Sequence, residues 1–235
     1  MVATFMDRRL TPDVEIEGRI FGVDEAGRGA MAGPLAVAAV EFPWPWLEPS
    51  NDLLRQSVRD SKVLSASIRN HLCQIITETC KYACVMIDST WIDDHGIQAA
   101  EAEGLNRVVE ELATGATDSG WHAFNWPDMV ICDGTEQTWN SVEFNPIALF
   151  KGVNLRFMVH GDRHVPAISA ASIVAKTFRD DYMRKILHLQ YPQYRFDLHV
   201  GYVTPLHLAK LDEFGSCPIH RHSFRPVGER DARDR

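Results

Sequence analysis

Four acidic residues are the side chains in this sequence most able to do chemistry. Asp24 and Glu25 are adjacent at the end of an apolar run, and Asp133 and Asp162 each follow a later apolar run. Carboxylates gathered at one rim of a sheet repel one another, and hard divalent cations with oxygen ligands relieve that repulsion. Two such cations can activate water and stabilise the leaving oxygen of a phosphodiester. The four acids predict a metal-dependent phosphodiester-cleaving site, although each aspartate taken singly is also typical of a turn or a helix cap.

A glycine-rich turn, residues 26–34, follows the first two acids. Glycines let backbone N–H groups approach a ligand closely. Neighbouring residues of a strand point to opposite faces, so Asp24 and Glu25 can share a site only near a bend or at a strand end. A solvated Asp-Glu turn is the alternative interpretation of this segment.

The elements that must position these residues are predicted from apolar periodicity. Strands come first, and helices then alternate with strands, which predicts an α/β fold around one sheet that is antiparallel at its start and parallel later. Small residues at the start of the third helix would let it lie close to the sheet. Strands are expected over residues 19–23, 35–42, 82–87, 129–132 and 154–159, and helices over 65–81 (with Ser65 as cap), 90–112, 168–187 and 205–214.

Length and composition restrict the class of protein. The 235 residues, 45% of them hydrophobic, suit one globular domain. The net charge of −8 is unusual for a nucleic-acid-binding protein, but catalytic carboxylates lower the total and bound cations reverse the local sign. Five scattered cysteines and no export signal predict reduced thiols rather than a zinc site. The longest apolar run is too short to span a membrane, so a cytoplasmic protein without a membrane partner is expected.

Several motifs, in order from about residue 19 to 227, resemble ribonuclease HII, the type 2 ribonuclease H family. They are Gly22-Val23-Asp24-Glu25-Ala26-Gly27-Arg28-Gly29 with Ala32-Gly33-Pro34, Asp60-Ser61-Lys62, Cys132-Asp133-Gly134, Gly161-Asp162-Arg163 with the run Ile168 to Lys176, Gly201-Tyr202, and His220-Arg221-His222-Ser223-Phe224.

This resemblance implies a ribonuclease H-like three-layer fold, with a mixed central sheet flanked by helices and a small C-terminal helical appendage. One domain would cover residues 1–235, with the catalytic core at about 18–200 and the appendage at about 201–228. Residues 1–13 and 229–235 are expected to be flexible.

The resemblance also implies an activity. Asp24, Glu25, Asp133 and Asp162 match the family's catalytic acids, which bind Mg²⁺ or Mn²⁺, with two metal ions expected. The enzyme would hydrolyse the RNA strand of RNA–DNA hybrids and cut 5′ of ribonucleotides embedded in duplex DNA. The products would carry a 3′-hydroxyl and a 5′-phosphate, and the role would be ribonucleotide excision and primer removal.

Substrate contacts follow from the same matched positions. Gly27, Arg28 and Gly29 match the loop that reads the ribose 2′-hydroxyl, and Tyr202 matches the tyrosine that stacks on the neighbouring sugar. Other matched residues would contact phosphate or the duplex: Ser61, Lys62 and Lys176. Arg163, Arg179, Arg184 and Lys185 could also line the duplex, although a solvated helix face explains most of them.

Some positions depart from the family or leave alternatives open. Val63 and Val200 replace family lysines, which weakens the case for phosphate contacts there. An insertion at 136–152 and the tryptophan-containing loop 121–126 receive no predicted role. His220 and His222 could be a metal pair, or part of a basic motif at the surface or on phosphate. No aromatic sliding-clamp motif is evident in the tail, and protein partners are not predicted.

Three other functions are compatible with some of these residues. A catalytically silent nucleic-acid-binding module of the same fold is the main alternative, and the loss of an acid would be its mark. A type 3 ribonuclease H usually carries lysine where Arg28 stands, and an aspartyl-phosphate phosphatase needs an Asp-x-Asp pair rather than adjacent acids.

Overall fold

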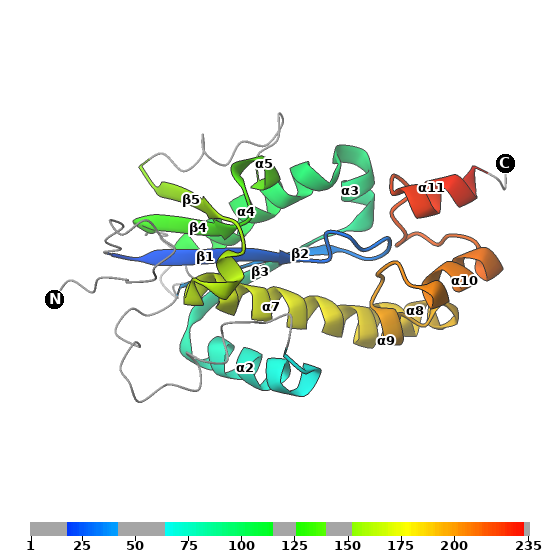
Figure 1. Ribbon diagram of the computed structural model, residues 1–235, viewed down its shortest axis with the longest axis horizontal. Helices are drawn as coiled ribbons and strands as arrows, with labels where there is room; N and C mark the ends of the chain where they lie inside the picture. Colours follow the sequence, from blue (N-terminus) through cyan, green and yellow to red (C-terminus); the bar gives the residue numbers. More distant parts are fainter. Residues whose placement is uncertain (1–17, 42–63, 115–125, 140–151, 233–235) are drawn as a thin grey trace.

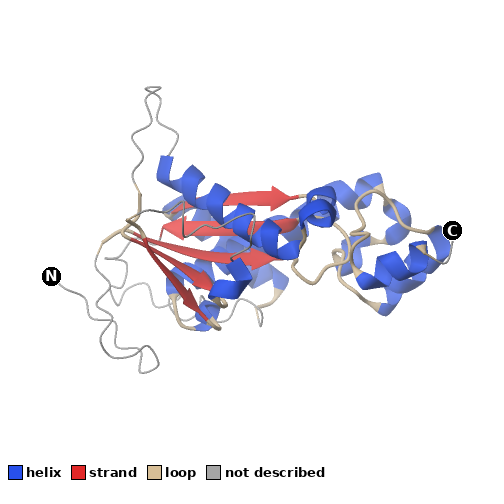
Figure 2. Cartoon of the chain, turned by 90° about the horizontal axis from the view of Figure 1, so that it is seen from above, coloured by secondary structure: helices blue, strands red, loops and turns tan. Residues whose placement is uncertain are grey.

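The computed structural model describes residues 18–41, 64–114, 126–139 and 152–232. In these ranges a five-stranded mixed sheet lies between two layers of helices, and a group of short helices sits at one end of it (Figure 1, Figure 2). The predicted three-layer α/β fold with a C-terminal helical appendage is confirmed. Among the helices in these ranges, none has the length and apolar character needed to cross a membrane.

The sheet has the strand order β3-β2-β1-β4-β5. β1 pairs antiparallel with β2, which pairs antiparallel with β3, whereas β1, β4 and β5 are parallel neighbours. β1 continues to Ala26 instead of ending at Val23, so Asp24 and Glu25 lie within the strand rather than after it. The strands are β1 (Ile20–Ala26), β2 (Leu35–Glu41), β3 (Lys81–Ile87), β4 (Met129–Asp133) and β5 (Asn154–Met158).

One face of the sheet is covered by α3 (Ser89–His95) and α4 (Ile97–Thr114) (Figure 1). The apolar side of α4 packs into a cluster with the buried side chains of β1, β2 and β4. A single helix was predicted over 90–112, but Gly96 has φ 86° and ends α3, its N–H bonding to the carbonyl of Ile92. Glycine adopts this left-handed conformation without steric cost and commonly ends helices.

The opposite face is covered by α7 (Pro166–Tyr182), with α2 (Ala66–Thr79) packed against it. Ser65 caps α2 as predicted, its hydroxyl accepting the N–H of Ile68. α7 begins two residues before its predicted start and is followed by a π-helical turn, η4 (Met183–Leu187), and by the short α8 (His188–Gln190). Small alanines of α7 pack on small residues of β2, as the sequence indicated.

The group of short helices begins before residue 201, where the appendage was expected to start, and residues 192–232 are called the appendage from here on. It contains η5 (Pro192–Tyr194), α9 (Phe196–His199), α10 (Pro205–Phe214) and α11 (Arg225–Asp231). α10 has its predicted bounds. α11 was not predicted, and it places Glu229–Asp231 in a helix where a flexible tail was expected. The reason is tertiary, because Arg230 Nε pairs with Asp212 Oδ1 of α10 at 2.5 Å and Asp231 accepts the hydroxyl of Ser216.

His220 and His222 lie in different environments, so the prediction of a surface position holds for His222 and is wrong for His220. His220 is fully buried, with its Nε2 3.1 Å from Nε2 of His207 and its Nδ1 accepting the N–H of Cys217. Burial lowers the pKa of His220 to about 4 and that of His207 to about 3. His220 is therefore a neutral residue of the appendage core, while the half-exposed His222 pairs with Asp231.

Gly22 sets how closely α7 can approach the sheet, and this gives a test of the packing. A Cβ at this position would lie 2.2 Å from the backbone carbon of Ala167 in the first turn of α7. We expect Gly22→Ala to lower the free energy of unfolding by about 1–3 kcal/mol or more, because overpacking forces the two elements apart.

Chemical denaturation measures this change. Gly29→Ala is the control, because a Cβ there would meet no atom within 4 Å, and we expect its effect to stay within about 0.5 kcal/mol. Equal unfolding midpoints for the two variants would contradict the close α7–β1 contact.

Candidate active site

The parallel register between β1 and β4 brings two of the predicted acids side by side. Val23 is paired with Cys132, so Asp24 and Asp133 follow as the next residues of adjacent strands. Side chains at matching positions of neighbouring strands point to the same face of a sheet. Asp24 is 2% exposed, and the charge of Asp133 contributes to raising its pKa.

The fourth acid, Asp162, lies in the short 3₁₀ helix η3 (Gly161–Arg163) that follows β5. Oδ1 of Asp133 accepts the N–H of Gly161 at 2.6 Å and, more weakly, the N–H of Asp162 at 3.4 Å. Ser169, in the first turn of α7, donates its hydroxyl to the carbonyl of Asp162. These bonds hold the buried Asp162 next to Asp133, at the same rim of the sheet.

A tryptophan at the start of the insertion forms a hydrogen bond to the backbone of Asp133. α5 (Glu136–Trp139) opens the insertion, and the indole of the fully buried Trp139 donates to the carbonyl of Asp133 at 2.5 Å. The start of the insertion therefore has a structural role that the sequence did not indicate. Most of it, and most of the loop 121–126, lies outside the described residues.

Burial and like charge raise the pKa of both acids in β1. For Asp24 the largest cause is burial, followed by the charges of Glu25 and Asp133, with hydrogen bonds from Ser172 and from the N–H of Glu25 opposing them. Burial, then the charge of Glu101, raises the pKa of Glu25 to about 7. These carboxyl groups cannot all be ionised at neutral pH without a compensating positive charge.

The chemistry of these donors fits a hard divalent cation. The groups are carboxylates at a buried rim, and Mg²⁺ is usually held by one or two carboxylates together with water and substrate phosphate. In the described parts of the chain, no three His, Cys, Asp or Glu side chains converge into a ready-made metal cage.

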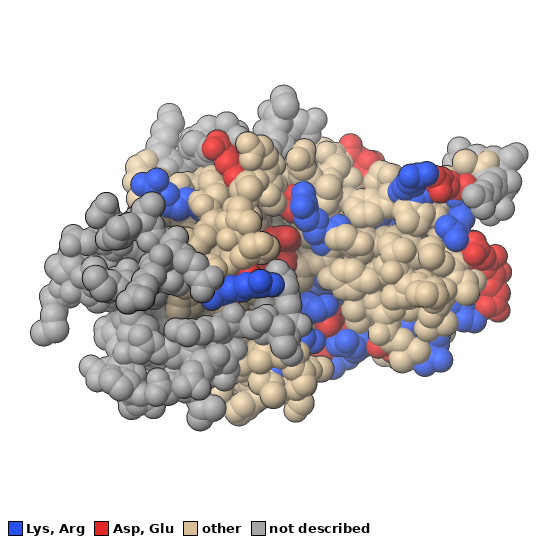
Figure 3. All heavy atoms as spheres, in the orientation of Figure 1, with Lys and Arg blue, Asp and Glu red and all other residues tan. Residues whose placement is uncertain are grey.

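A cavity of about 300 Å³ adjoins the acids and brings most of the predicted substrate residues together. Asp133 and Asp162 are outside its lining, and Ser61 and Lys62 are outside the described residues. On the face drawn in Figure 3, Asp and Glu atoms lie recessed near the middle of the molecule, with Lys and Arg atoms around them. The cavity is lined by Asp24, Glu25, Ala26, Gly27, Arg28, Gly29, Arg69, Ser172, Lys176 and Tyr202.

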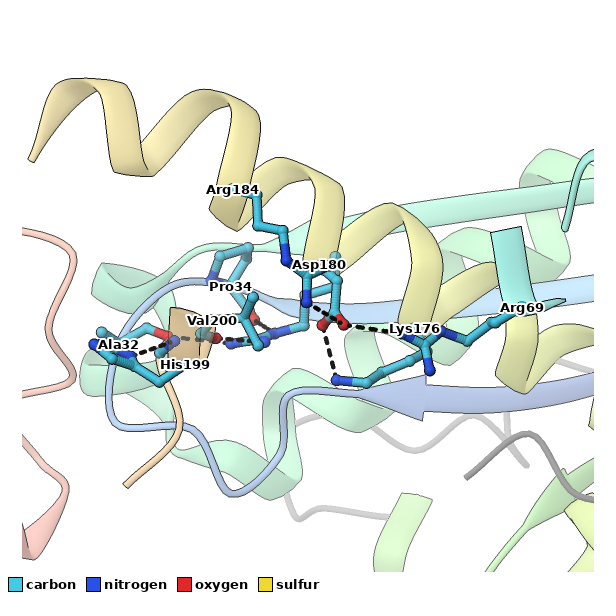
Figure 4. A network of polar contacts seen from close by, with 10 residues as sticks. Ala32, Pro34, Arg69, Lys176, Asp180, Arg184, His199 and Val200 are labelled. Carbon is cyan, nitrogen blue, oxygen red and sulfur yellow. Dashed lines mark hydrogen bonds and ion pairs between the residues drawn. The ribbon is translucent and has the colours of Figure 1, made fainter. Parts of the chain in front are cut away.

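Two buried arginines hold the glycine turn in place. Arg179 donates to the carbonyls of Pro34, Val200 and Ala32, three residues labelled in Figure 4. A Cβ on Gly27 would collide with the guanidinium of Arg179. Arg221 donates to the carbonyls of Gly33 and Arg28. Arg179 was considered as a duplex contact, but it is fully buried and is instead a structural tie between the turn and the appendage.

The cationic side chains of Lys176 and Arg69, which line the cavity, both contact the buried Asp180 (Figure 4). Its carboxylate pairs with Lys176 at 2.8 Å, with Arg69 at 3.4 Å and with Arg184 at 3.5 Å. Lys176 also lies 4.8 Å above the ring of Tyr202. The sequence singled out Lys176 but missed Arg69, whose only local signal is a charged residue among the apolar positions of α2.

Val200 stands where the family carries lysine, and it serves the appendage core. Its side chain is 5% exposed and packs among the apolar residues beneath Tyr202. Its φ of 43° is unusual for a β-branched residue. The carbonyl that Val200 presents in this conformation accepts a bond from Arg179.

Comparison with known proteins agrees with this geometry. The family model described as Ribonuclease HII matches residues 21–227. The chain is 42% identical over 209 residues to a ribonuclease HII of Xanthomonas campestris pv. campestris (strain 8004), an alignment covering 88% of this chain and 75% of that protein. The chain belongs to the ribonuclease HII family. It is therefore a hydrolase, an endonuclease of the ribonuclease H type.

Solved structures share the fold of this ribonuclease HII family member. The ribonuclease H2 of Pyrococcus horikoshii OT3 matches with a TM-score of 0.67 and 24% identity, covering 92% of this chain and 98% of that one. Bst ribonuclease HIII in complex with Mn²⁺ matches with a TM-score of 0.60 and 17% identity, covering 91% and 69%.

The raised pKa of Glu25 predicts a pH-dependent difference between two proteins in EDTA. In the unfolded chain this carboxyl ionises near 4.5 and in the folded chain near 7. The free energy of unfolding of the parent therefore decreases as pH rises from about 4.5 to about 7, because Glu25 ionises more readily in the unfolded chain. We expect the free energy of unfolding of Glu25→Gln to match that of the parent near pH 4.5. Above pH 7 it should exceed the parent's value by up to about 3 kcal/mol.

Urea unfolding of parent and variant from pH 4.5 to 8 measures this difference. Glu213→Gln, at an exposed position of α10, is the matched control and should show no such trend. A Glu25→Gln variant that loses stability relative to the parent as pH rises would show that the carboxylate is favourably paired in the metal-free protein.

Proposed function

We propose that this enzyme uses divalent metal ions to cut the RNA strand of RNA–DNA hybrids and to cut 5′ of ribonucleotides embedded in duplex DNA. The products would carry a 3′-hydroxyl and a 5′-phosphate. The observation that carries the proposal is the β1–β4 register, which puts Asp24 beside Asp133. The same strand places Asp24 and Glu25 in the wall of a cavity that also contains the glycine turn and Tyr202.

Asp24, Glu25, Asp133 and Asp162 would hold Mg²⁺ or Mn²⁺, with two ions expected. A bound ion would supply an activated water and stabilise the leaving oxygen. The raised pKa values of Asp24 and Glu25 support this role, because a cation is what such crowded, buried carboxylates lack. The binding of Mn²⁺ by Bst ribonuclease HIII, which has the same fold, is in line with it.

The cavity walls suggest how the substrate is recognised. Gly27, Arg28 and Gly29 would contact the ribose 2′-hydroxyl, the group that separates RNA from DNA. The ring of Tyr202, which has Lys176 Nζ 4.8 Å and Arg179 Cζ 5.1 Å from its centroid, would stack on the neighbouring sugar. Lys176 would contact phosphate, as would Ser61 and Lys62, and we add Arg69 because it lines the same cavity.

In the cell, such an enzyme would remove ribonucleotides from DNA and take part in primer removal. These roles belong to DNA repair and replication and would place it in the cytoplasm. The net charge of −8 does not oppose binding to a polyanion, because Lys176, Arg69 and Arg184 gather around Asp180 beside the site.

The test is cleavage of an end-labelled DNA duplex that carries one ribonucleotide, beside an all-DNA duplex. With Mg²⁺ or Mn²⁺ we expect one cut, 5′ of the ribonucleotide, and no cut in EDTA or in the all-DNA duplex. Asp24→Asn should lower the rate by more than about 100-fold, because the loss of even an outer-shell partner of a metal ligand costs about 10–100-fold.

Asp181→Asn is the matched control, since Asp181 is an exposed residue of α7 paired with Lys185. Its rate should equal that of the parent enzyme. Undiminished cleavage by Asp24→Asn would refute the assignment of the site. Binding of the ribonucleotide duplex without cleavage by the parent would favour a catalytically silent module, and cleavage of long hybrids alone would favour a type 3-like specificity.

A further inference from the structure

Glu101 is a fully buried carboxylate that the sequence did not single out. It lies in the first half of α4, and its Oε1 is 2.7 Å from Nε of Arg28 in the glycine turn. Burying a carboxylate is costly unless a charged partner compensates it. Within the described residues, Arg28 is the only cationic side chain that forms an ion pair with Glu101.

Arg28 is held at both ends. Its backbone carbonyl accepts a bond from the buried Arg221 at 3.0 Å, and its guanidinium pairs with Glu101. The side chain nevertheless remains 48% exposed and lines the cavity that contains Asp24 and Glu25. An arginine side chain has many rotamers, and fixing one of them before binding removes an entropic cost from the binding step.

The pair also lies within electrostatic reach of the acids. The charge of Arg28 lowers the pKa of Glu25, and the charge of Glu101 raises it. Burial raises the pKa of Glu101 itself to about 8, and the charge of Arg28 opposes this rise, so the pairing with Arg28 favours the charged form of Glu101.

We propose that Glu101 is a positioning residue, which fixes Arg28 in the orientation that contacts the ribonucleotide-containing strand. The inference rests on the proposed function, because it assumes that the cavity takes this substrate. Stability alone does not account for Glu101, since replacing a buried ion pair by uncharged residues of similar volume is often neutral or stabilising.

The experiment measures binding and turnover in parallel. Fluorescence anisotropy in EDTA gives the affinity for a DNA duplex with one ribonucleotide and for an all-DNA duplex, and cleavage with Mg²⁺ gives kcat and KM. The variants are Glu101→Gln, Arg28→Gln and the double variant. Glu103→Gln is the control, because Glu103 is a partly buried glutamate on the same helix and forms an ion pair with Arg107 at 2.6 Å.

We expect Glu101→Gln to weaken binding of the ribonucleotide duplex by about tenfold, to raise KM by a similar factor and to change kcat by less than about threefold. Binding of the all-DNA duplex should change less, and Glu103→Gln should match the parent throughout. In the Arg28→Gln background, Glu101→Gln should cause no further loss, because its effect passes through Arg28.

Two results would overturn the inference. In the first, Glu101→Gln binds the ribonucleotide duplex as tightly as the parent does. In the second, Glu101→Gln weakens this binding by the same factor in the Arg28→Gln background. If Glu101→Gln fails to fold, Glu101→Met removes the charge at similar volume, and failure of both would make Glu101 a structural residue. Should the parent cut no duplex, the proposed function itself fails. If the parent cuts the duplex and Glu101→Gln has the same affinity and KM as the parent, only the proposed role of Glu101 fails.

Discussion

The parallel pairing of β1 with β4 is the constraint on which the rest of the structure depends. It fixes Asp24 next to Asp133, in a place where burial and like charge keep the pKa of Asp24 high. α7 can lie over this part of β1 only because residue 22 has no side chain, and the turns before α7 carry Asp162 to the same rim. The charged form of Asp24 is therefore less favourable at this rim than it would be in water.

The C-terminal appendage is part of the site rather than an addition to it. The bridges between Ala30 and Tyr202 and between Ala32 and His220 join it to the glycine turn. Arg179 and Arg221, both fully buried, supply donors to the carbonyls of that turn. The buried guanidinium of Arg221 donates to two carbonyl groups, which do not neutralise its charge. Burial, and after it the charge of Arg179, lowers the pKa of Arg221 to about 9. The turn consequently keeps one geometry beside the acids.

Local patterns were enough to predict most of the fold and part of the site. The Ser65 cap and the small first residues of α7 depend on neighbouring residues, and the order of the motifs led to the prediction of the four acids. The end of β1 was not predicted correctly, because the strand continues through Asp24 and Glu25 to Ala26. Burial of charged residues was not predictable in the same way. Arg179 bonds to Pro34, 145 residues away, and Arg221 to Gly33, 188 residues away. Glu101 and Arg69 look like surface charges of their helices until their partners are known. Gly96 did give a local signal for the break between α3 and α4, and α11 gave none because contacts with α10 hold it.

The acids of β1, β4 and η3 are proposed to bind divalent cations. Anomalous diffraction from crystals soaked in Mn²⁺ locates such ions directly, with Asp24→Asn crystals treated in the same way. We expect an anomalous peak in contact with the carboxylates of Asp24 and Asp133 in the parent protein, and a weaker peak or none in the variant. A Mn²⁺-saturated parent crystal with no peak at these carboxylates, or with equal peaks in both proteins, would contradict it.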